Sequence, residues 1–237
     1  MEQQDEPEMV FEAKSRYLSL HGSYIDQLGN QTTEHVTSEM IQNRITRDQG
    51  SGHHITVVNH LDMRYLMPPP TEEEESNRKK ARKHTRDALK HVRDTMINEF
   101  GQASEWERPV DLGLGSTEEG EAVTYYRVLH WPWGQRMRGF LGLGHGHFHI
   151  TVGFKPRDVH LYKGPATLLC LRKGAVCTTP QIQSLVQYAP FYYGDDVFIK
   201  NLIRTCVRHG HYGSGARLSA GYLYCKNQRE AHHYNHD

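Results

Sequence analysis

One four-residue phrase, His-Ile-Thr-Val, occurs twice in this chain, at residues 54–57 and again at residues 149–152. In a chain with 17 His and 37% hydrophobic residues, the pattern of His, apolar residue, Ser or Thr, and apolar residue is expected only about 0.25 times. Both copies are rich in β-branched residues and have glycines nearby, which is typical of strands. The repeat therefore predicts two equivalent strands that the fold must accommodate.

The strand period determines what these two phrases can present. Side chains alternate between the faces of a strand, so His54 and Thr56 share one face, and His149 and Thr151 share one face of the second strand. The Ile and Val residues of each phrase point the other way and are expected to be buried. Each strand would then present an imidazole and a hydroxyl, about 6–7 Å apart, to a common cleft.

Two imidazoles that flank one spot suit in-line displacement at phosphorus. A neutral His can take a proton from the nucleophile, a protonated His can supply one to the leaving oxygen, and Thr hydroxyls can hydrogen-bond the non-bridging oxygens. The pattern predicts catalytic roles for His54 and His149 and phosphate-binding roles for Thr56 and Thr151. A bell-shaped pH dependence is expected, with both limbs where imidazoles titrate.

The paired His-x-Thr-x phrases resemble those of the two-histidine (2H) phosphoesterase superfamily, and in particular cyclic phosphodiesterase domains of RNA repair. The resemblance implies an α/β (α+β) fold with two lobes, in which two largely antiparallel sheets flank a central cleft and helices lie outside. It extends over roughly residues 15–165 and implies the same roles for the two His and two Thr residues. It also implies a mechanism without a metal ion or another cofactor.

Hydrophobic periodicity predicts the other elements. We expect residues 1–165 to form the bilobed core and residues 166–237 to complete or extend the second lobe. The chain is expected to end in a frayed tail with His232, His233 and His236. Strands are expected at 16–21, 53–59, 110–115, 122–130, 148–154 and 167–172, and helices at 33–47, 71–100, 180–188 and 195–207.

Two features of this layout depend on particular residues. Thr71 is the expected N-cap of the second helix, whose basic run at 78–83 could grip phosphates, although a solvated helix face is the simpler interpretation. No long helix is expected between Tyr125 and His147, where many members of the resembled superfamily place one.

Other residues near the repeat have alternative interpretations. His145, His147 and His149 alternate, which allows a metal site, but three such residues spread over about 13 Å and suit one tetrahedral ion poorly. His53 points away from His54 and is expected to be structural. Basic residues could balance the charge of a phosphate and aromatic residues could stack on a base: Arg136, Arg138, Lys155 and Arg157, and Tyr125, Tyr126, Trp131 and Trp133.

Charge and composition limit the partners and the compartment. With 28 basic and 28 acidic residues, the chain is neutral overall, which favours a short contact with an RNA end over a long track along its backbone. No apolar run is long enough to cross a membrane, the acidic start lacks a secretory pattern, and the four Cys show no Cys-x-x-Cys spacing. We expect a cytoplasmic protein, with a nuclear location as the alternative.

These observations predict a metal-independent phosphodiesterase that opens a 2′,3′-cyclic phosphate on an RNA end or a nucleotide and leaves a 2′-phosphate. A related enzyme would cleave a 2′,5′ linkage or trim a 3′–5′ RNA end with the same histidines. A module that binds RNA or a nucleotide without turnover is the alternative from another class, and a histidine-rich metal-binding protein is the third hypothesis.

Overall fold

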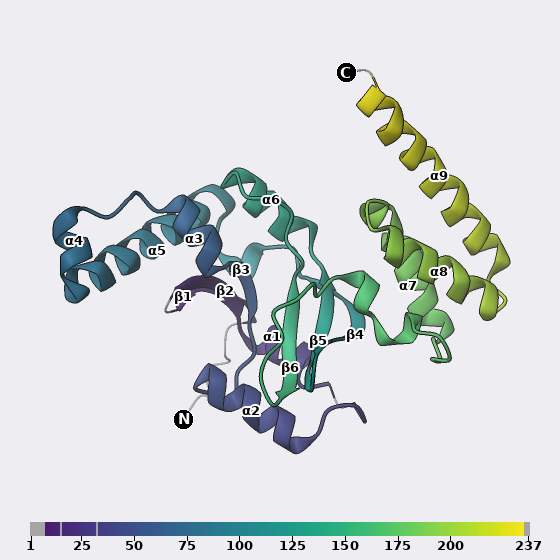
Figure 1. The fold of residues 1–237 in the computed structure, drawn as a ribbon, viewed down its shortest axis with the longest axis horizontal. Coiled ribbons are helices and arrows are strands. Elements are labelled where there is room, and N and C mark those ends of the chain that lie inside the picture. Colours follow the sequence, from purple (N-terminus) through teal and green to yellow (C-terminus); the bar gives the residue numbers. More distant parts are fainter. Residues whose placement is uncertain (1–7, 15, 32, 235–237) are drawn as a thin grey trace.

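A computed structural model describes residues 8–14, 16–31 and 33–234. Two three-stranded antiparallel sheets lie at its centre, with helices around them (Figure 1). This arrangement confirms the expected mixed α and β fold built on antiparallel sheets. The first sheet has the order β1-β2-β3 and the second β4-β5-β6. Their strands are β1 (Val10–Lys14), β2 (Tyr17–His21), β3 (Ile55–Val58), β4 (Val110–Glu119), β5 (Ala122–His130) and β6 (His149–Lys155).

Helices flank the sheets on both sides. In Figure 1, α4 and α5 extend to one side of the sheets, and α7, α8 and α9 lie on the other. The α-helices are α1 (Ser23–Gly29), α2 (Ser38–Asp48), α3 (His60–Leu66), α4 (Glu72–Ser76), α5 (Arg78–Phe100), α6 (Pro132–Phe140), α7 (Thr179–Tyr188), α8 (Asp196–Arg208) and α9 (Tyr212–Tyr234). Short 3-10 helices cover Ala103–Glu105, Pro165–Thr167, Leu169–Leu171 and Ala189–Tyr192.

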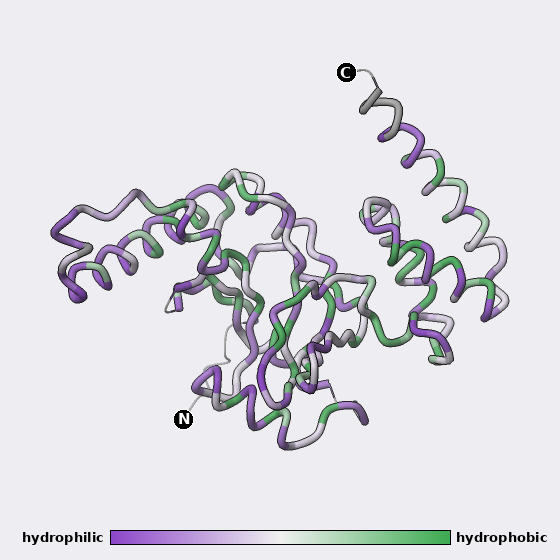
Figure 2. Tube along the Cα trace, in the orientation of Figure 1, coloured by the Kyte–Doolittle hydropathy of each residue, from purple (hydrophilic) through white to green (hydrophobic). Residues whose placement is uncertain are grey.

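Two hydrophobic cores hold these elements together. The first joins both sheets to α5 and α6, and it includes Leu20, Ile55, Met96 and Ile150, none of which is exposed to solvent. The second lies between the second sheet and the C-terminal helices, where Val128 packs with residues such as Leu202. Each fully buried aliphatic side chain of this kind contributes about 1.5–3 kcal/mol to folding. Figure 2 shows hydrophobic residues along the strands and along α7 and α8.

The projecting helices are hydrophilic. Thr71 caps α4 through a reciprocal capping box with Glu74, as its sequence position predicts. The predicted helix over 71–100 is broken at Asn77, whose side chain caps α5 instead. Several basic side chains of α5 pair with neighbouring acids: Lys80 with Glu73, and Lys83 with Asp87 at 2.7 Å. These pairs agree with a solvated helix face.

Three further expectations about secondary structure are wrong. The strand expected at 167–172 is instead two 3-10 turns with one isolated bridge, between Gly115 and Leu168, because Pro165 and the bond from Thr167 Oγ1 to the Gly164 carbonyl (2.7 Å) favour a turn. Helix α6 lies where no long helix was expected. Gly134 weakens the helical pattern of this segment, because glycine disfavours a helix. Close packing nevertheless requires glycine there, since an added Cβ would meet Trp131 at 2.2 Å.

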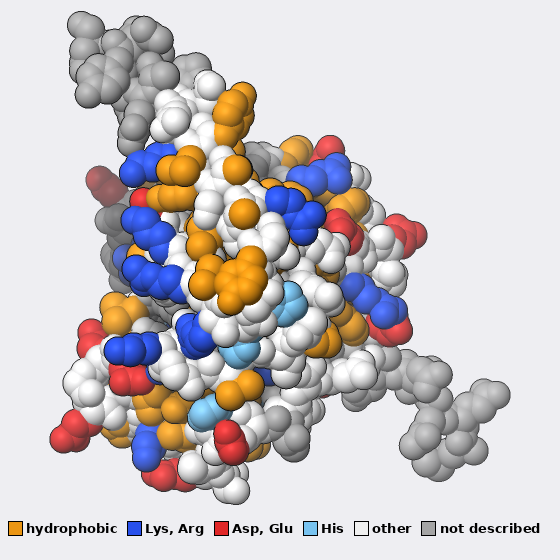
Figure 3. Space-filling view, turned by 90° about the vertical axis from the view of Figure 1, so that its right-hand side faces the viewer, with side chains coloured by type: hydrophobic (Ala, Val, Ile, Leu, Met, Phe, Trp, Pro, Cys, Tyr) orange, Lys and Arg blue, Asp and Glu red, His pale blue; other side chains and the backbone are white. Residues whose placement is uncertain are grey.

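The third concerns the C-terminal end. His232 and His233 lie in α9, which continues to Tyr234, and not in a frayed tail, whereas His236 lies outside the described residues. Hydrophobic and basic side chains intermingle on the side of the molecule formed by α7, α8 and α9 (Figure 3), and Tyr212 and Tyr224 are each 67% exposed. No helix in the described part of the chain is long and apolar enough to span a membrane.

Candidate active site

The two copies of the repeated phrase lie on strands of different sheets, and a buried histidine links them. His53 is only 2% exposed, and its Nδ1 lies 3.2 Å from the backbone carbonyl of Thr151 in the second copy. On its other side, Arg44 Nη2 lies 3.4 Å from His53 Nε2. Burial and then the Arg44 charge lower the pKa of His53, so the ring is neutral and Nδ1–H can donate to the carbonyl. The expected structural role of His53 thus becomes a specific contact between the two motifs.

Both copies show the alternation expected for strands. In each, the Ile and the second aliphatic residue are buried, while the His and the Thr are partly exposed. Strand β3 itself begins at Ile55, so His54 stands immediately before it, whereas His149 is the first residue of β6. The imidazole and the hydroxyl of each copy therefore face the same way.

The first imidazole lies among side chains of β2. The His54 ring stacks on Tyr17, with ring centroids 5.5 Å apart, and lies 5.6 Å from His21. His21 Nε2 is 2.6 Å from Oγ of the buried Ser19, and Ser19 is the strand partner of Thr56. Because these β2 residues alternate, Tyr17, Ser19 and His21 share the face that carries His54 and Thr56.

The second imidazole is held by backbone and aromatic contacts. His149 Nδ1 lies 3.0 Å from the carbonyl of His147, and the ring meets Tyr126 edge to face at 5.6 Å. A neutral imidazole that donates from Nδ1 leaves an unprotonated Nε2. The geometry therefore selects the tautomer in which Nε2 can accept a proton.

A buried charged cluster lies beside both imidazoles. Asp158 accepts from Lys163 Nζ at 3.0 Å and from Thr124 Oγ1 at 3.0 Å, and it also pairs with Arg47 of α2. Lys163 is 5% exposed. Helix α2 packs across β6, and Asn43 donates to the Phe154 carbonyl at 3.0 Å, which brings Arg47 to this place.

These surroundings lower the basicity of both imidazoles. Burial lowers the pKa of His54 to about 4; Asp48 opposes this effect, and Arg47 and a protonated His21 add to it. Burial and then Lys163 lower the pKa of His149 to about 3, and the charge of His54 acts in the same direction. The two imidazoles therefore lie within electrostatic reach of each other, and both are neutral at pH 7.

The basic residues expected near the phosphate have other partners. Arg138 is buried and binds the carbonyl of Val57 and the carboxylate of Asp62, each at 2.8 Å. Arg157 pairs with Glu119 at 2.5 Å, Arg136 lies over the Trp133 ring at 4.8 Å, and Lys155 is exposed. The charges beside the imidazoles come instead from Arg47 and Lys163, which no sequence motif marks.

The aromatic residues expected to stack on a base are also placed elsewhere. Trp131 is 1% exposed and donates its indole N–H to the Glu107 carbonyl at 2.7 Å, and Tyr126 is fully buried under His149. Tyr125 stacks on His35 at 6.1 Å, and Trp133 packs against Phe100 in the first core. None of these four rings is among the described residues that line the cavity between His147 and Asp195.

Metal binding through the alternating histidines finds no support in the geometry. His145 and His147 approach each other edge to face at 5.7 Å. Among the described residues, no group of three or more His, Cys, Asp or Glu side chains is arranged to hold a metal ion.

Comparison with known proteins places this site in a family. No curated protein and no solved structure matches the chain. The sequence model described as "2H-SAK: Swiss Army Knife, 2H phosphoesterase domain" matches residues 16–160, which is more than half of the chain and includes both repeated phrases. Helices α7, α8 and α9 lie beyond the match. The chain belongs to the two-histidine (2H) phosphoesterase superfamily.

Proposed function

We propose that this protein hydrolyses the 2′,3′-cyclic phosphate of an RNA end or a nucleotide, by acid/base catalysis with His54 and His149. Membership of the 2H phosphoesterase superfamily supports a phosphodiesterase-type hydrolase in general. The observation that carries the finer proposal is the pair of half-buried imidazoles, which come from two sheets, are joined through His53, and lie beside the cations Arg47 and Lys163.

The surroundings of the two imidazoles support different roles for them. Burial and Lys163 lower the pKa of His149 to about 3, whereas burial lowers the pKa of His54 only to about 4, because Asp48 partly offsets the effect of burial. A single proton shared by the pair therefore resides on His54, which becomes the general acid. His149, with its Nδ1–H bound to the His147 carbonyl, becomes the general base through Nε2.

The reaction then follows an in-line course. His149 Nε2 takes a proton from water as the water oxygen bonds to phosphorus, and the bond from phosphorus to the 3′ oxygen breaks. His54 gives its proton to that oxygen, which leaves a 2′-phosphate. The hydroxyls of Thr56 and Thr151 donate to the non-bridging oxygens, and the positive field of Arg47 and Lys163 stabilises their charge. Each proton has a residue to carry it, so these steps need no metal ion.

The test is incubation of the purified protein with 2′,3′-cyclic nucleotides and with an oligoribonucleotide that ends in a cyclic phosphate. Products are separated beside authentic 2′- and 3′-monophosphates. We expect a 2′-phosphate and a rate that a chelator leaves unchanged. A 3′-phosphate would contradict the regiochemistry, and a metal-dependent rate would contradict the mechanism. Binding without turnover would indicate a binding module, and turnover of only 2′,5′- or 3′–5′-linked RNA would indicate an end-trimming enzyme.

A further inference from the structure

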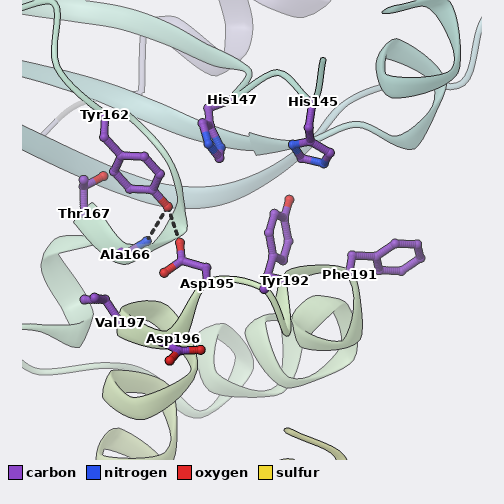
Figure 4. Close-up of a pocket in the computed structure, with 11 residues that line it drawn as sticks. His145, His147, Tyr162, Ala166, Thr167, Phe191, Tyr192, Asp195, Asp196 and Val197 are labelled. Atoms are coloured by element: carbon purple, nitrogen blue, oxygen red, sulfur yellow. Dashed lines mark hydrogen bonds between the residues drawn. The ribbon is translucent and has the colours of Figure 1, made fainter. Parts of the chain in front are cut away.

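A cavity of about 740 Å³ lies where the C-terminal segment meets the approach to β6 (Figure 4). Its volume is within the range of roughly 300–1,000 Å³ that is usual for small-molecule sites. All of its walls except His145 and His147 come from residues beyond the matched family region. Its lining includes His145, His147, Tyr162, Thr167, Tyr192 and Asp195.

The cavity adjoins the second motif. His147 lines the cavity and lies two residues before His149, the first residue of β6. The His147 carbonyl also holds His149 Nδ1 at 3.0 Å. On another wall, the Thr167 hydroxyl and the edge of the Tyr126 ring each lie 2.9 Å from the position that a Cβ would take at Gly115, and the Tyr126 ring contacts His149. A group in the cavity would therefore lie next to a phosphate held at His149.

Aromatic rings surround a carboxylate in this cavity. The His147 and Tyr162 rings meet edge to face at 4.7 Å, and in Figure 4 the rings of Tyr162, His147 and Tyr192 stand around Asp195. Asp195 accepts the Tyr162 hydroxyl on Oδ2 and the Phe198 N–H on Oδ1 at 2.9 Å. Each carboxylate oxygen has two lone pairs, so Asp195 can accept a further donor.

The charge of the lining excludes a phosphate. Asp195 and Asp196 are acidic, and no Lys or Arg is among the described residues that line the cavity. Burial lowers the pKa values of His145 and His147, so both rings are neutral at pH 7. The phosphate of a substrate is therefore drawn toward Lys163 and Arg47, and the cavity suits a neutral, planar group that can donate a hydrogen bond.

We propose that this cavity binds the nucleobase of the nucleotide that carries the cyclic phosphate, and that it favours bases with an exocyclic amino group. The inference rests on the proposed function, because it takes the phosphate to be bound between His54 and His149. The ribose carries the base at C1′ and the cyclic phosphate on its 2′ and 3′ oxygens. One sugar ring therefore separates base and phosphate, which fits a base cavity that adjoins the phosphate site. The C-terminal segment thus determines which nucleotide is accepted.

The experiment compares four esters: the 2′,3′-cyclic monophosphates of adenosine, cytidine and uridine, and methyl riboside 2,3-cyclic phosphate, which has no base. We expect kcat/KM for the base-free ester to be at least about tenfold below that for cytidine, the scale of one base stacked on aromatic rings. Uridine, which lacks the amino group, should fall several-fold below adenosine and cytidine. Asp195→Asn, which keeps the α8 N-cap, should reduce that difference.

Substitutions at Tyr162 test whether the preference for substrates with a base arises in the cavity. Tyr162→Leu should raise KM for the cytidine ester about tenfold with kcat nearly constant, and it should affect the base-free ester much less. Tyr162→Phe keeps the ring and should retain most of the affinity. Tyr212→Leu makes the same change at an aromatic residue of α9 that is 67% exposed and does not line the cavity, and it should leave KM unchanged.

Two negative results have different meanings. If all four esters are hydrolysed equally well, or if Tyr162→Leu and Tyr212→Leu behave alike, the base site is wrong while the proposed function stands. If no ester is hydrolysed, the proposed function fails, and calorimetry with cytidine 2′-monophosphate and with methyl riboside 2-phosphate then decides on the cavity. Tighter binding of the nucleotide that Tyr162→Leu abolishes supports the base site, and equal binding of the two compounds overturns it.

Discussion

The two motif strands carry the same four residues in different surroundings. His54 lies against Tyr17 and His21 of a sheet whose strands have four or five residues, whereas β6 belongs to a sheet with strands of seven to ten residues that C-terminal helices cover. His149 meets Tyr126 and lies near Lys163, and its Nδ1 is bound to a carbonyl. The shared residues determine the shared face, and the neighbours determine the different chemistry of the two imidazoles.

The strongest test of this comparison removes each imidazole. His54→Ala and His149→Ala should each lower kcat by at least about 10²-fold, the usual contribution of a general acid or base. Turnover of a 2′,3′-cyclic nucleotide measures the effect, and His60→Ala, at an exposed histidine just after β3, is the control. Near-full activity in either folded variant would exclude paired catalysis.

The hydroxyls should matter equally in both strands, but less than the imidazoles. Thr56→Ala and Thr151→Ala should each lower kcat/KM by about 10–10²-fold, because a neutral donor stabilises phosphate charge without moving a proton. Thr→Ser at either position keeps the hydroxyl and should be milder. Losses larger than those of the histidine variants, in well-folded protein, would mean that the roles are assigned wrongly.

The pH dependence of kcat/KM should reflect the low pKa values of the two imidazoles. Because pKa values of about 4 and about 3 leave both imidazoles neutral at pH 7, kcat/KM should rise up to about tenfold per unit as pH falls toward 5. A bound phosphate anion favours the protonated imidazoles, so the kcat profile should lie at higher pH. A profile centred on the ordinary imidazole range for the free enzyme would contradict the effect of burial.

Lys163→Met tests whether Lys163 causes the lower pKa of His149. Removal of the cation should raise the pKa of His149, so the acid limb of kcat/KM should move to higher pH. The protein should remain folded, because Asp158 keeps its contacts with Arg47 and Thr124. An acid limb that does not move would show that Lys163 does not act on His149.

The smallest effect on turnover is expected from the link between the strands. His53→Ala leaves the Thr151 carbonyl without this donor and should lower the free energy of unfolding by about 1–3 kcal/mol, measured by denaturant titration. Turnover should fall only several-fold, through kcat, and His53→Asn should restore part of both losses. An unchanged unfolding free energy would show that the link does not hold the motifs together.

The sequence predicts the face of each motif residue better than it predicts their neighbours. Period two was enough to place His54 with Thr56 and His149 with Thr151, because alternation is a property of the strand itself. Arg47 and Lys163 reach the site through tertiary packing, which spacing along the chain does not reveal. The same limit led us to expect Trp131 and Arg138 near the substrate, although both are buried by contacts distant in sequence.

The close packing of α2 against β6 determines whether the two halves of the chain can fold separately. At Gly153 an added Cβ would meet Val36 and the Met40 backbone at 2.8 and 3.0 Å, so a helix from the first half of the chain rests directly on a strand of the second. A chain severed between β3 and β4 would give two fragments that each expose apolar surface the other normally covers. The fragments should fold only as a complementing pair, so we expect the protein to unfold as one cooperative unit although its motif occurs twice.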